Sequence, residues 1–351
     1  MVFVSGPRVR AVGLAVPPHA VRQQDIKEFA AFLFQEKLAH LERLLPVFDN
    51  ACIAKRHLAQ PLAWYATGHS FAEANLLYGE IALELAAAAA AQALERAGVA
   101  PGDVGLVVFV SSTGITTPTI DAKLIQRLGI SPNAARLPVW GLGCAGGVTG
   151  LARAAELAVA VPGRAVLLVA AELCSLTFQR NDFSKSNLVG AGIFADGAAA
   201  AVITADGEGP ELLGARSTLF AGTEDIMGWD MIDTGLKVRF SRDIPAFVRQ
   251  YLPGLAADAC REWGLAHRDI VHYVVHPGGA KVLDAYADSL GLPAETLAAA
   301  YEVLAEYGNM SSASVLFVLE RFMGGTPPRD LYGIMLALGP GFSAEQVLFR
   351  W

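Results

Sequence analysis

One cysteine lies where the chain could use it as a nucleophile. Cys144 is set among glycines in Gly141-Leu-Gly-Cys144-Ala-Gly-Gly147, where a loop is predicted to enter a helix. Glycines let the backbone turn sharply and allow a substrate to approach it. Peptide dipoles at a helix N-terminus stabilise negative charge and tend to lower the pKa of a thiol there. The segment therefore predicts a Cys144 thiolate near neutral pH.

Two further residues could assist such a nucleophile. His276 ends an apolar run typical of a buried strand and enters Pro277-Gly-Gly279. An imidazole there could pair with the thiolate and donate a hydrogen bond to an enolate or thioester oxygen. Asn309 carries an amide that is neutral at any pH and could donate to the same oxygen, although Asn is also a common helix N-cap. The combination of Cys, His and Asn indicates this chemistry more specifically than any one of them.

The elements that would position these residues alternate between strands and helices. Almost wholly apolar runs indicate strands that are buried on both faces of a sheet. Strands are predicted at 104–111, 164–171, 198–204 and 271–275. Helices are predicted at 25–45, 81–97, 121–128, 144–160 and 246–263, the last kinked or broken at Pro253.

The second half of the chain echoes the first. Ser111 and His276 each end a buried strand, and the next special position follows 33 residues later in each half, at Cys144 and at Asn309. Both positions follow a glycine and precede small residues and a helix. Regular spacing of this kind indicates an internal repeat. We therefore predict two similar α/β halves, 1–205 with the nucleophile and 206–351 with His276 and Asn309.

Composition excludes several classes of protein. The 351 residues are 53% hydrophobic and 17% charged, which is typical of a globular chain with a large core. A net charge of −7 without any Lys/Arg run argues against nucleic acid as the main partner. We expect no signal peptide and no transmembrane segment, and hence a cytoplasmic protein.

The cysteines show no spacing that would suit a metal site. Cys52, Cys144, Cys174 and Cys260 are widely separated, without the Cys-x-x-Cys pattern of a zinc or redox pair. We expect Cys52 and Cys260 to be small buried side chains. No metal or bound redox cofactor is expected.

Five segments together resemble the type III polyketide synthases, the chalcone-synthase-like branch of the thiolase-fold condensing enzymes. The resemblance covers nearly the whole chain. The segments are Trp140-Gly-Leu-Gly-Cys144-Ala-Gly-Gly, Phe194-Ala-Asp-Gly-Ala-Ala-Ala200, His276-Pro-Gly-Gly279, Tyr307-Gly-Asn309-Met-Ser-Ser-Ala-Ser and Gly339-Pro-Gly-Phe342. The resemblance implies a five-layered αβαβα fold of two similar halves, a homodimer, and a buried Cys-His-Asn triad reached through a coenzyme A tunnel.

The resemblance also assigns roles residue by residue. It implies that Cys144 takes a starter acyl group from its CoA thioester, while His276 and Asn309 promote malonyl-CoA decarboxylation by stabilising the enolate. Phe194 corresponds to a gatekeeper phenylalanine between tunnel and cavity. The second gatekeeper position matches Val238, so an aromatic starter pocket of the plant type is not expected here. The motif Gly339-Pro340-Gly341 is expected to help form the substrate site.

Other segments look more like the bacterial alkylpyrone and alkylresorcinol branch, whose members often take fatty acyl-CoA starters. Small side chains at Thr113, Thr117 and Cys174 would leave volume for an acyl tunnel, although they could equally be ordinary core residues. Charge and approximate position suggest ligands for the coenzyme A phosphates. These are Lys55, Arg56 and Lys281.

We therefore expect an acyltransferase that loads an acyl-CoA starter, extends it with malonyl-CoA, and closes a pyrone or resorcinol ring. A malonyl-primed tetrahydroxynaphthalene synthase is one alternative. A ketoacyl synthase III-like enzyme is another, but it usually carries an Asn shortly after the histidine, where this chain has Pro277-Gly-Gly279. A hydroxymethylglutaryl-CoA synthase would also need a catalytic Glu, and none lies in the matching glycine-rich loops. A noncatalytic acyl-binding partner with the thiolase fold would tolerate loss of the cysteine, whereas Cys144, His276 and Asn309 are all present here.

Overall fold

The first half of the chain builds a five-stranded sheet. The computed structural model describes residues 2, 6–35, 41–325 and 327–351. The strands lie in the order β5 (Ala135–Trp140), β4 (Val104–Ser111), β6 (Ala165–Leu173), β7 (Asp196–Thr204) and β1 (Arg8–Ala15). β4 is parallel to β5 and β6, and β7 is antiparallel to β6 and β1. Every residue of β4 is buried, as its apolar sequence predicts.

The second half builds a smaller sheet with the same pattern. Its strands lie in the order β8 (Glu211–Leu219), β13 (Ser343–Arg350), β12 (Tyr332–Gly339) and β11 (Ile270–Val275), with only β11 and β12 parallel. The two sheets meet at one residue pair, Arg8 with Glu211. The chain thus contains two similar half-sheets, which confirms the predicted fold class.

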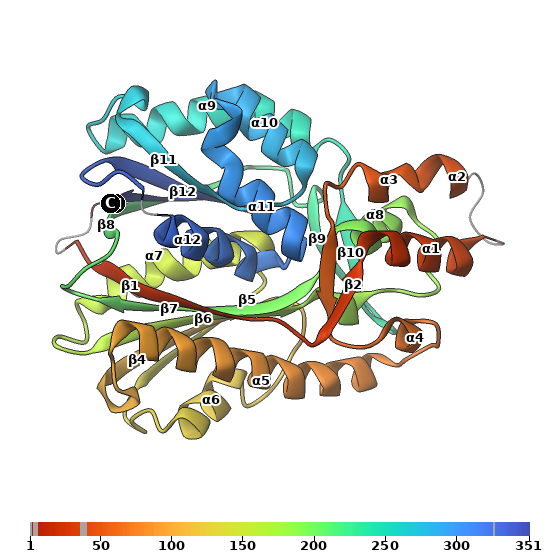
Figure 1. Ribbon diagram of the computed structural model, residues 1–351, viewed down its shortest axis with the longest axis horizontal. Coiled ribbons are helices and arrows are strands. Elements are labelled where there is room, and N and C mark those ends of the chain that lie inside the picture. The colour runs from red at the N-terminus through yellow and green to blue at the C-terminus, as the bar shows by residue number, and fades with distance from the viewer. Residues whose placement is uncertain (1, 3–5, 36–40, 326) are drawn as a thin grey trace.

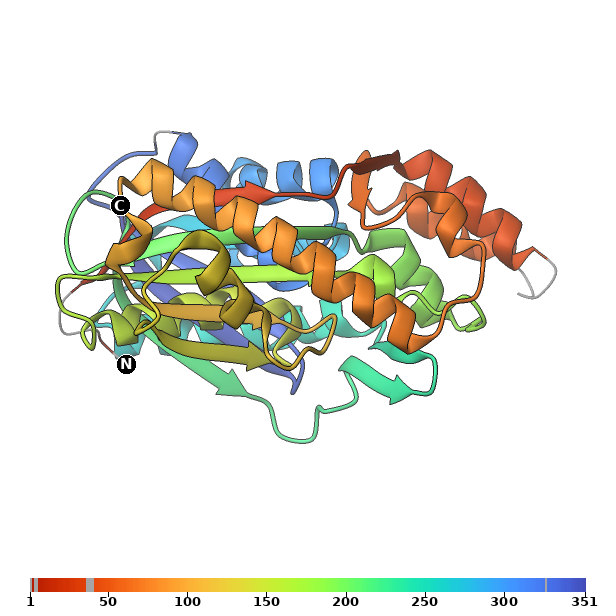
Figure 2. The same cartoon turned by 90° about the horizontal axis from the view of Figure 1, so that it is seen from below.

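Helices separate and cover the two sheets (Figure 1). α7 (Gly146–Ala158) and α12 (Ser314–Gly324) lie between the sheets and contact strands of both halves. α5 (Phe71–Ala97) and α6 (Ile120–Leu128) cover the outer face of the first sheet, and Figure 2 shows α5 running along that face. α9 (Ile244–Glu262) and α10 (Ala280–Leu290) cover the second sheet. Helix, sheet, helix, sheet and helix form the five layers.

Short elements gather at one end of the layers (Figure 1). They include two small antiparallel ribbons that carry residues of interest below. The elements are β2 (His19–Arg22) with β3 (Lys55–Leu58), β9 (Met227–Ile232) with β10 (Gly235–Phe240), and helices α1 (Gln23–Phe34), α2 (Leu41–Leu44), α3 (Pro46–Asp49), α4 (Leu62–Tyr65) and α8 (Lys185–Ile193). α11 (Ala298–Tyr307) lies beside α12 and contacts β3.

Three helix predictions need correction. The helix predicted at 81–97 begins earlier, at Phe71. Ser70 and Glu73 form a capping box there, which satisfies the free N–H groups of the first turn. The helix predicted at 25–45 is not continuous: α1 ends at Phe34, α2 begins at Leu41, and residues 36–40 lie outside the described chain. α9 continues past Pro253, whose ring lies on an exposed position of the helix.

Helix α5 is long and apolar enough to cross a membrane by length and composition alone. In the structure it packs instead along β1, β6 and β7, and most of its alanines are buried. We therefore interpret α5 as a core helix.

The two central helices approach each other very closely where they begin. A methyl group placed on Gly147, in the first turn of α7, would lie 2.2 Å from the carbonyl oxygen of Ser312, just before α12. Atoms in a closely packed interior cannot retreat without moving the backbone. The space left by Gly147 therefore sets how near the Cys144 and Asn309 turns can come.

Replacing this glycine should weaken the fold. Gly147→Ala should lower the free energy of unfolding by about 1–3 kcal/mol, because the added methyl overpacks the junction of the two halves. Chemical denaturation followed by circular dichroism would measure it. Gly254→Ala in α9 is the matched control, since nothing lies within 4 Å of the new methyl. It should leave stability unchanged or raise it by about 0.5–1 kcal/mol, and an equal loss in both variants would contradict the prediction.

Candidate active site

Cys144 lies in a tight turn that leads directly into α7. A 3₁₀ turn, Gly143–Ala145, precedes the helix, and the backbone N–H of Gly143 donates to Ser112 Oγ at 3.0 Å. The thiol is buried, with 5% of the residue exposed. Its sulfur lies 3.9 Å from Asn309 Oδ1. The structure thus places the predicted nucleophile beside the predicted amide.

The amide of Asn309 is held in one orientation. Its Oδ1 accepts from the backbone N–H of Ser311 at 2.8 Å, and its Nδ2 donates to the carbonyl of Gly278 at 3.1 Å. Its backbone forms an isolated parallel bridge with Phe194. Because Nδ2 carries two hydrogens, one N–H remains for an incoming oxygen.

His276 follows β11 and faces the same cavity as Cys144 and Asn309. Its backbone N–H donates to Leu336 at 2.8 Å, which fixes its place beside β12. Within the described part of the chain, neither ring nitrogen has a hydrogen-bond partner, although both are buried. Burial lowers the pKa of His276 to about 3, so the imidazole is neutral at pH 7. One ring nitrogen can therefore accept a proton and the other can donate one.

The predicted low pKa of Cys144 is wrong. Burial raises the pKa of the thiol to about 12, and the nearby Glu172 carboxylate adds to the rise. Hydrogen bonds with Ser311 and Asn309 offset only part of it. The loss of solvation outweighs the helix dipole here. The resting site therefore holds a neutral thiol and a neutral imidazole rather than an ion pair.

Glu172 is a residue of the site that sequence reasoning missed. Its buried carboxylate accepts from Ser112 N at 3.0 Å, Thr113 Oγ1 at 2.7 Å and Ser312 Oγ at 2.5 Å, with a longer contact to Ser111 Oγ. Burial raises its pKa to about 7, although these donors lower it in part. Nothing local in the sequence marks this glutamate, because its partners come from distant segments.

The cavity that holds the three residues has a volume of about 390 Å³ and a cationic rim. No Asp or Glu occurs among the described residues that line it. Four exposed cations line it instead: Arg43, Lys185, Arg242 and Lys281. Of the predicted coenzyme A ligands, Lys281 lies here, whereas Lys55 is exposed on β3 and is not among the lining residues.

The prediction that Arg56 binds a coenzyme A phosphate is wrong. It is 2% exposed, and its guanidinium donates to Gln23 Oε1 at 3.0 Å and to the carbonyls of Phe194 at 2.5 Å and Ala191 at 2.7 Å. These internal acceptors use all three of its nitrogens. Burial lowers its pKa to about 9, which still leaves it protonated at pH 7. Arg56 is an anchor for the Phe194 backbone.

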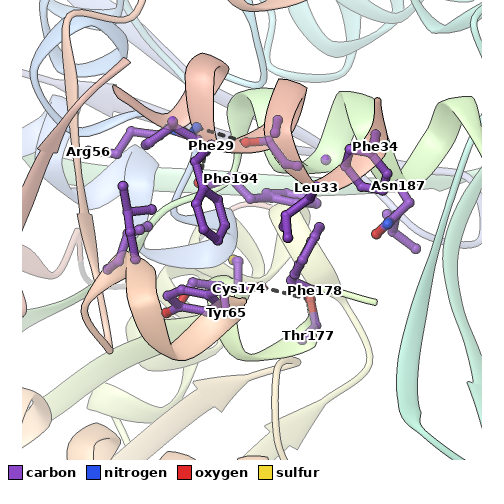
Figure 3. A pocket seen from close by; sticks show the side chains of 18 residues that line it. Phe29, Leu33, Phe34, Arg56, Tyr65, Cys174, Thr177, Phe178, Asn187 and Phe194 are labelled. Carbon is purple, nitrogen blue, oxygen red and sulfur yellow. Dashed lines mark hydrogen bonds between the residues drawn. The ribbon is translucent and has the colours of Figure 1, made fainter. Parts of the chain in front are cut away.

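A second, narrow cavity lies behind Phe194 (Figure 3). The Phe194 ring points into it, with Cys174 and Tyr65 on one side and Leu33 and Phe178 farther along. Val238 also lines it, so three of the predicted substrate residues meet here. The cavity has a volume of about 70 Å³, and most of the side chains that line it are apolar.

The remaining predicted tunnel residues lie elsewhere. Thr113 is buried, but its hydroxyl is bonded to Glu172 and to the backbone N–H of Leu173, so it does not line the cavity. Thr117 is exposed, in the loop before α6. Neither residue is among those that line the two cavities described above, so their role in a tunnel stays a prediction. Cys52 is also exposed rather than buried, whereas Cys260 is buried as expected.

The Gly339-Pro340-Gly341 segment packs behind the nucleophile turn. A methyl on Gly339 would lie 2.5 Å from Ala145 Cβ, and one on Gly143 would lie 2.8 Å from Pro340 Cδ. The neighbouring Leu338 lines the cavity of Cys144. The segment therefore supports the turn that carries the thiol.

Comparison with known proteins places this arrangement in a family. Residues 5–207 match the N-terminal domain and residues 211–351 match the C-terminal domain of the chalcone and stilbene synthases. The chain belongs to this family. It is a type III polyketide synthase and thus an acyltransferase that acts by decarboxylative condensation. Among the described residues, no cluster of His, Cys, Asp or Glu could hold a metal ion.

Named relatives are similar over their whole lengths. The chain is 42% identical to a putative chalcone synthase of Bacillus subtilis, over 98% of each chain. It is 40% identical to the 1,3,6,8-tetrahydroxynaphthalene synthase of Streptomyces peucetius, over 99% of this chain and 93% of the other. The crystal structure of the Streptomyces coelicolor enzyme of that name superposes with a TM-score of 0.94 at 30% identity, covering 98% and 99% of the two chains.

The raised thiol pKa predicts how the resting enzyme responds to pH. The rate of Cys144 alkylation by iodoacetamide should rise about tenfold for each pH unit between pH 7 and 9. Only the thiolate reacts, and at a pH below the pKa its fraction increases about tenfold with each unit of pH. Peptide mapping by mass spectrometry would separate Cys144 from the exposed Cys52. A rate independent of pH in this range would indicate a Cys144–His276 ion pair and contradict the structure.

Proposed function

We propose that this type III polyketide synthase loads a fatty acyl-CoA starter on Cys144, extends it with malonyl-CoA and closes a pyrone or resorcinol-type ring. The narrow apolar cavity behind Phe194 carries the choice of starter. The shared cavity of Cys144, His276 and Asn309 supports the chemistry.

Loading begins with the neutral pair. As the acyl-CoA carbonyl enters, the Cys144 thiol gives its proton to His276, and the sulfur attacks the carbonyl carbon. The bond to the CoA sulfur breaks, and the CoA thiolate takes the proton from His276. The neutral imidazole of His276 suits this step, because a ring nitrogen that carries no proton at pH 7 can accept the proton of the thiol directly.

Extension uses the two hydrogen-bond donors. The thioester oxygen of malonyl-CoA accepts from the protonated ring nitrogen of His276 and from the free N–H of Asn309. Loss of CO₂ leaves an enolate whose negative charge lies on that oxygen, and fixed donors in a dry site stabilise it strongly. The enolate carbon then attacks the thioester carbonyl on Cys144, and the carbon–sulfur bond breaks. The Cys144 thiolate leaves with the negative charge and takes up a proton from solvent, while the extended chain stays on CoA and can load again.

The cationic rim supports binding of coenzyme A thioesters. Arg43, Lys185, Arg242 and Lys281 present exposed cations at one cavity, and phosphates bind Arg and Lys readily. A structural relative, CsyB, has been solved in complex with CoA-SH, with a TM-score of 0.89 at 26% identity. We assign these four cations to the phosphates in place of Lys55 and Arg56.

The cavity behind Phe194 suits an alkyl chain. It runs from the Phe194 ring to the partly exposed side chains of Phe29 and Leu33 on α1. Removing apolar surface from water contributes about 0.8 kcal/mol for each buried CH₂ group. An unbranched acyl chain could bury its methylenes against these apolar side chains.

A malonyl-primed reaction is the second candidate. It is favoured by the tetrahydroxynaphthalene synthases among the relatives, one 40% identical and one superposing with a TM-score of 0.94. Such an enzyme would form product from malonyl-CoA alone. The apolar cavity would then hold part of the growing chain instead of a starter.

We further propose a cytoplasmic homodimer. β5 is an edge strand, and the exposed Trp140 at its end lies beside the loop that carries the exposed Ile115, since the Trp140 indole donates to the carbonyl of Gly114. An apolar edge of this kind is normally covered. The division into 1–205 and 206–351 stays a prediction, supported by the turn between β7 and β8 that joins the two half-sheets.

A product assay with three proteins tests the function. Wild-type enzyme, Cys144→Ala and Cys144→Gln would each be given malonyl-CoA with acyl-CoAs from acetyl to stearoyl, and with malonyl-CoA alone. We expect wild type to form long-chain pyrones or resorcinols, Cys144→Ala to form no acyl-enzyme, and Cys144→Gln still to release CO₂. Mass spectrometry identifies products and acyl-enzyme. Unimpaired product formation by either variant would refute the role of Cys144.

Filling the apolar cavity should shorten the accepted starter. Cys174→Phe should lower kcat/KM for palmitoyl-CoA by at least about tenfold while hexanoyl-CoA is retained, because the larger side chain takes the space of several methylenes. Steady-state kinetics with both starters would measure it. Val159→Phe is the control, since Val159 is exposed on the surface. Equal losses for both starters would place the alkyl chain elsewhere.

A further inference from the structure

One fully buried tyrosine among the residues that line the cavity of Cys144 has no role so far. Tyr286 lies on α10, the helix that follows the His276 loop beside β11 (Figure 1). The residue is 0% exposed, and it lines the same cavity as Cys144, His276 and Leu338. Within the described chain, its Oη neither donates nor accepts a hydrogen bond.

An unpaired buried hydroxyl is costly. A buried polar group without a partner typically costs about 1–3 kcal/mol, and a tyrosine in the core normally finds one. Phenylalanine would fill the same space without this cost. The hydroxyl is therefore suited to a partner that arrives in the cavity, and an acceptor atom of the substrate is such a partner.

Its surroundings keep the group a donor. Burial raises the pKa of the Tyr286 phenol, and negative charge on the Cys144 sulfur would raise it further. The hydroxyl therefore stays protonated throughout the reaction, as a hydrogen-bond donor to an oxyanion must.

We infer that the Tyr286 hydroxyl binds the carbonyl oxygen of the acyl group that Cys144 carries. This inference rests on the proposed loading of Cys144. As the sulfur–carbon bond forms, the carbonyl electron pair moves onto that oxygen, which accepts from Tyr286. When the bond to the CoA sulfur breaks, the pair returns to form the carbonyl. The phenol keeps its proton, and the enolate oxygen of malonyl-CoA remains with His276 and Asn309.

The test removes one oxygen atom. Tyr286→Phe should slow single-turnover formation of the Cys144 acyl-enzyme by about 100-fold, as expected for loss of one oxyanion donor. Decarboxylation of malonyl-CoA, measured in a Cys144→Gln background, should stay within about twofold. The melting temperature should be unchanged or higher, since no protein partner is lost. Tyr273→Phe, at a buried tyrosine outside the cavity, is the matched control.

The outcomes separate this inference from the proposed function. Wild-type protein that forms no acyl-enzyme with any acyl-CoA or with malonyl-CoA would overturn the proposed loading itself. Normal loading by wild type and by Tyr286→Phe alike would overturn only the role of Tyr286. A fall in melting temperature with equal losses of loading and decarboxylation would show a structural role and overturn it too.

Discussion

The buried carboxylate of Glu172 joins the two halves of the molecule where the chemistry takes place. It accepts from Ser112 and Thr113, which follow β4, and from Ser312 before α12. Ser112 in turn accepts from the backbone of Gly143, next to the nucleophile. A buried charge without donors would be very unfavourable, so the serines and the threonine must stay in place around it. The Cys144 turn and the Asn309 turn are thereby held in register.

The same burial sets the protonation state of the reactive groups. It raises the pKa of Cys144 to about 12 and lowers that of His276 to about 3, so charge separation at rest is unfavourable. A substrate carbonyl that can take up negative charge makes proton transfer from the thiol favourable. The proposed reaction needs donors that already point at that oxygen, and the Asn309 amide is held in place by hydrogen bonds at both its oxygen and its nitrogen.

The sequence predicted the parts of this arrangement that local pattern determines. Wholly apolar runs located the buried strands, for example β4 at its observed bounds. The equal spacing from Ser111 to Cys144 and from His276 to Asn309 predicted the repeat, because equivalent strand ends and helix starts face each other across the two sheets. Cys144, His276 and Asn309 accordingly line one cavity.

The errors came from properties that depend on distant partners. Arg56 and Lys55 are neighbours in the sequence, yet on a β-strand adjacent side chains point to opposite faces, so one is buried and the other exposed. The burial that raises the Cys144 pKa and the donors that surround Glu172 come from both halves of the chain. Neither the charge of one residue nor the type of its neighbours could reveal them.

The buried Arg56 also links the apolar cavity behind Phe194 to the Asn309 turn. It binds the carbonyl of Phe194, whose backbone bridges to Asn309, while the Phe194 ring borders the apolar cavity. Movement of the Phe194 backbone would therefore displace the catalytic amide. Cys174 and Val238 line the same cavity without any described backbone bond to Asn309. The apolar cavity can thus change shape at these two side chains without moving Asn309, whereas the backbone at Phe194 is constrained both by Arg56 and by its bridge to Asn309.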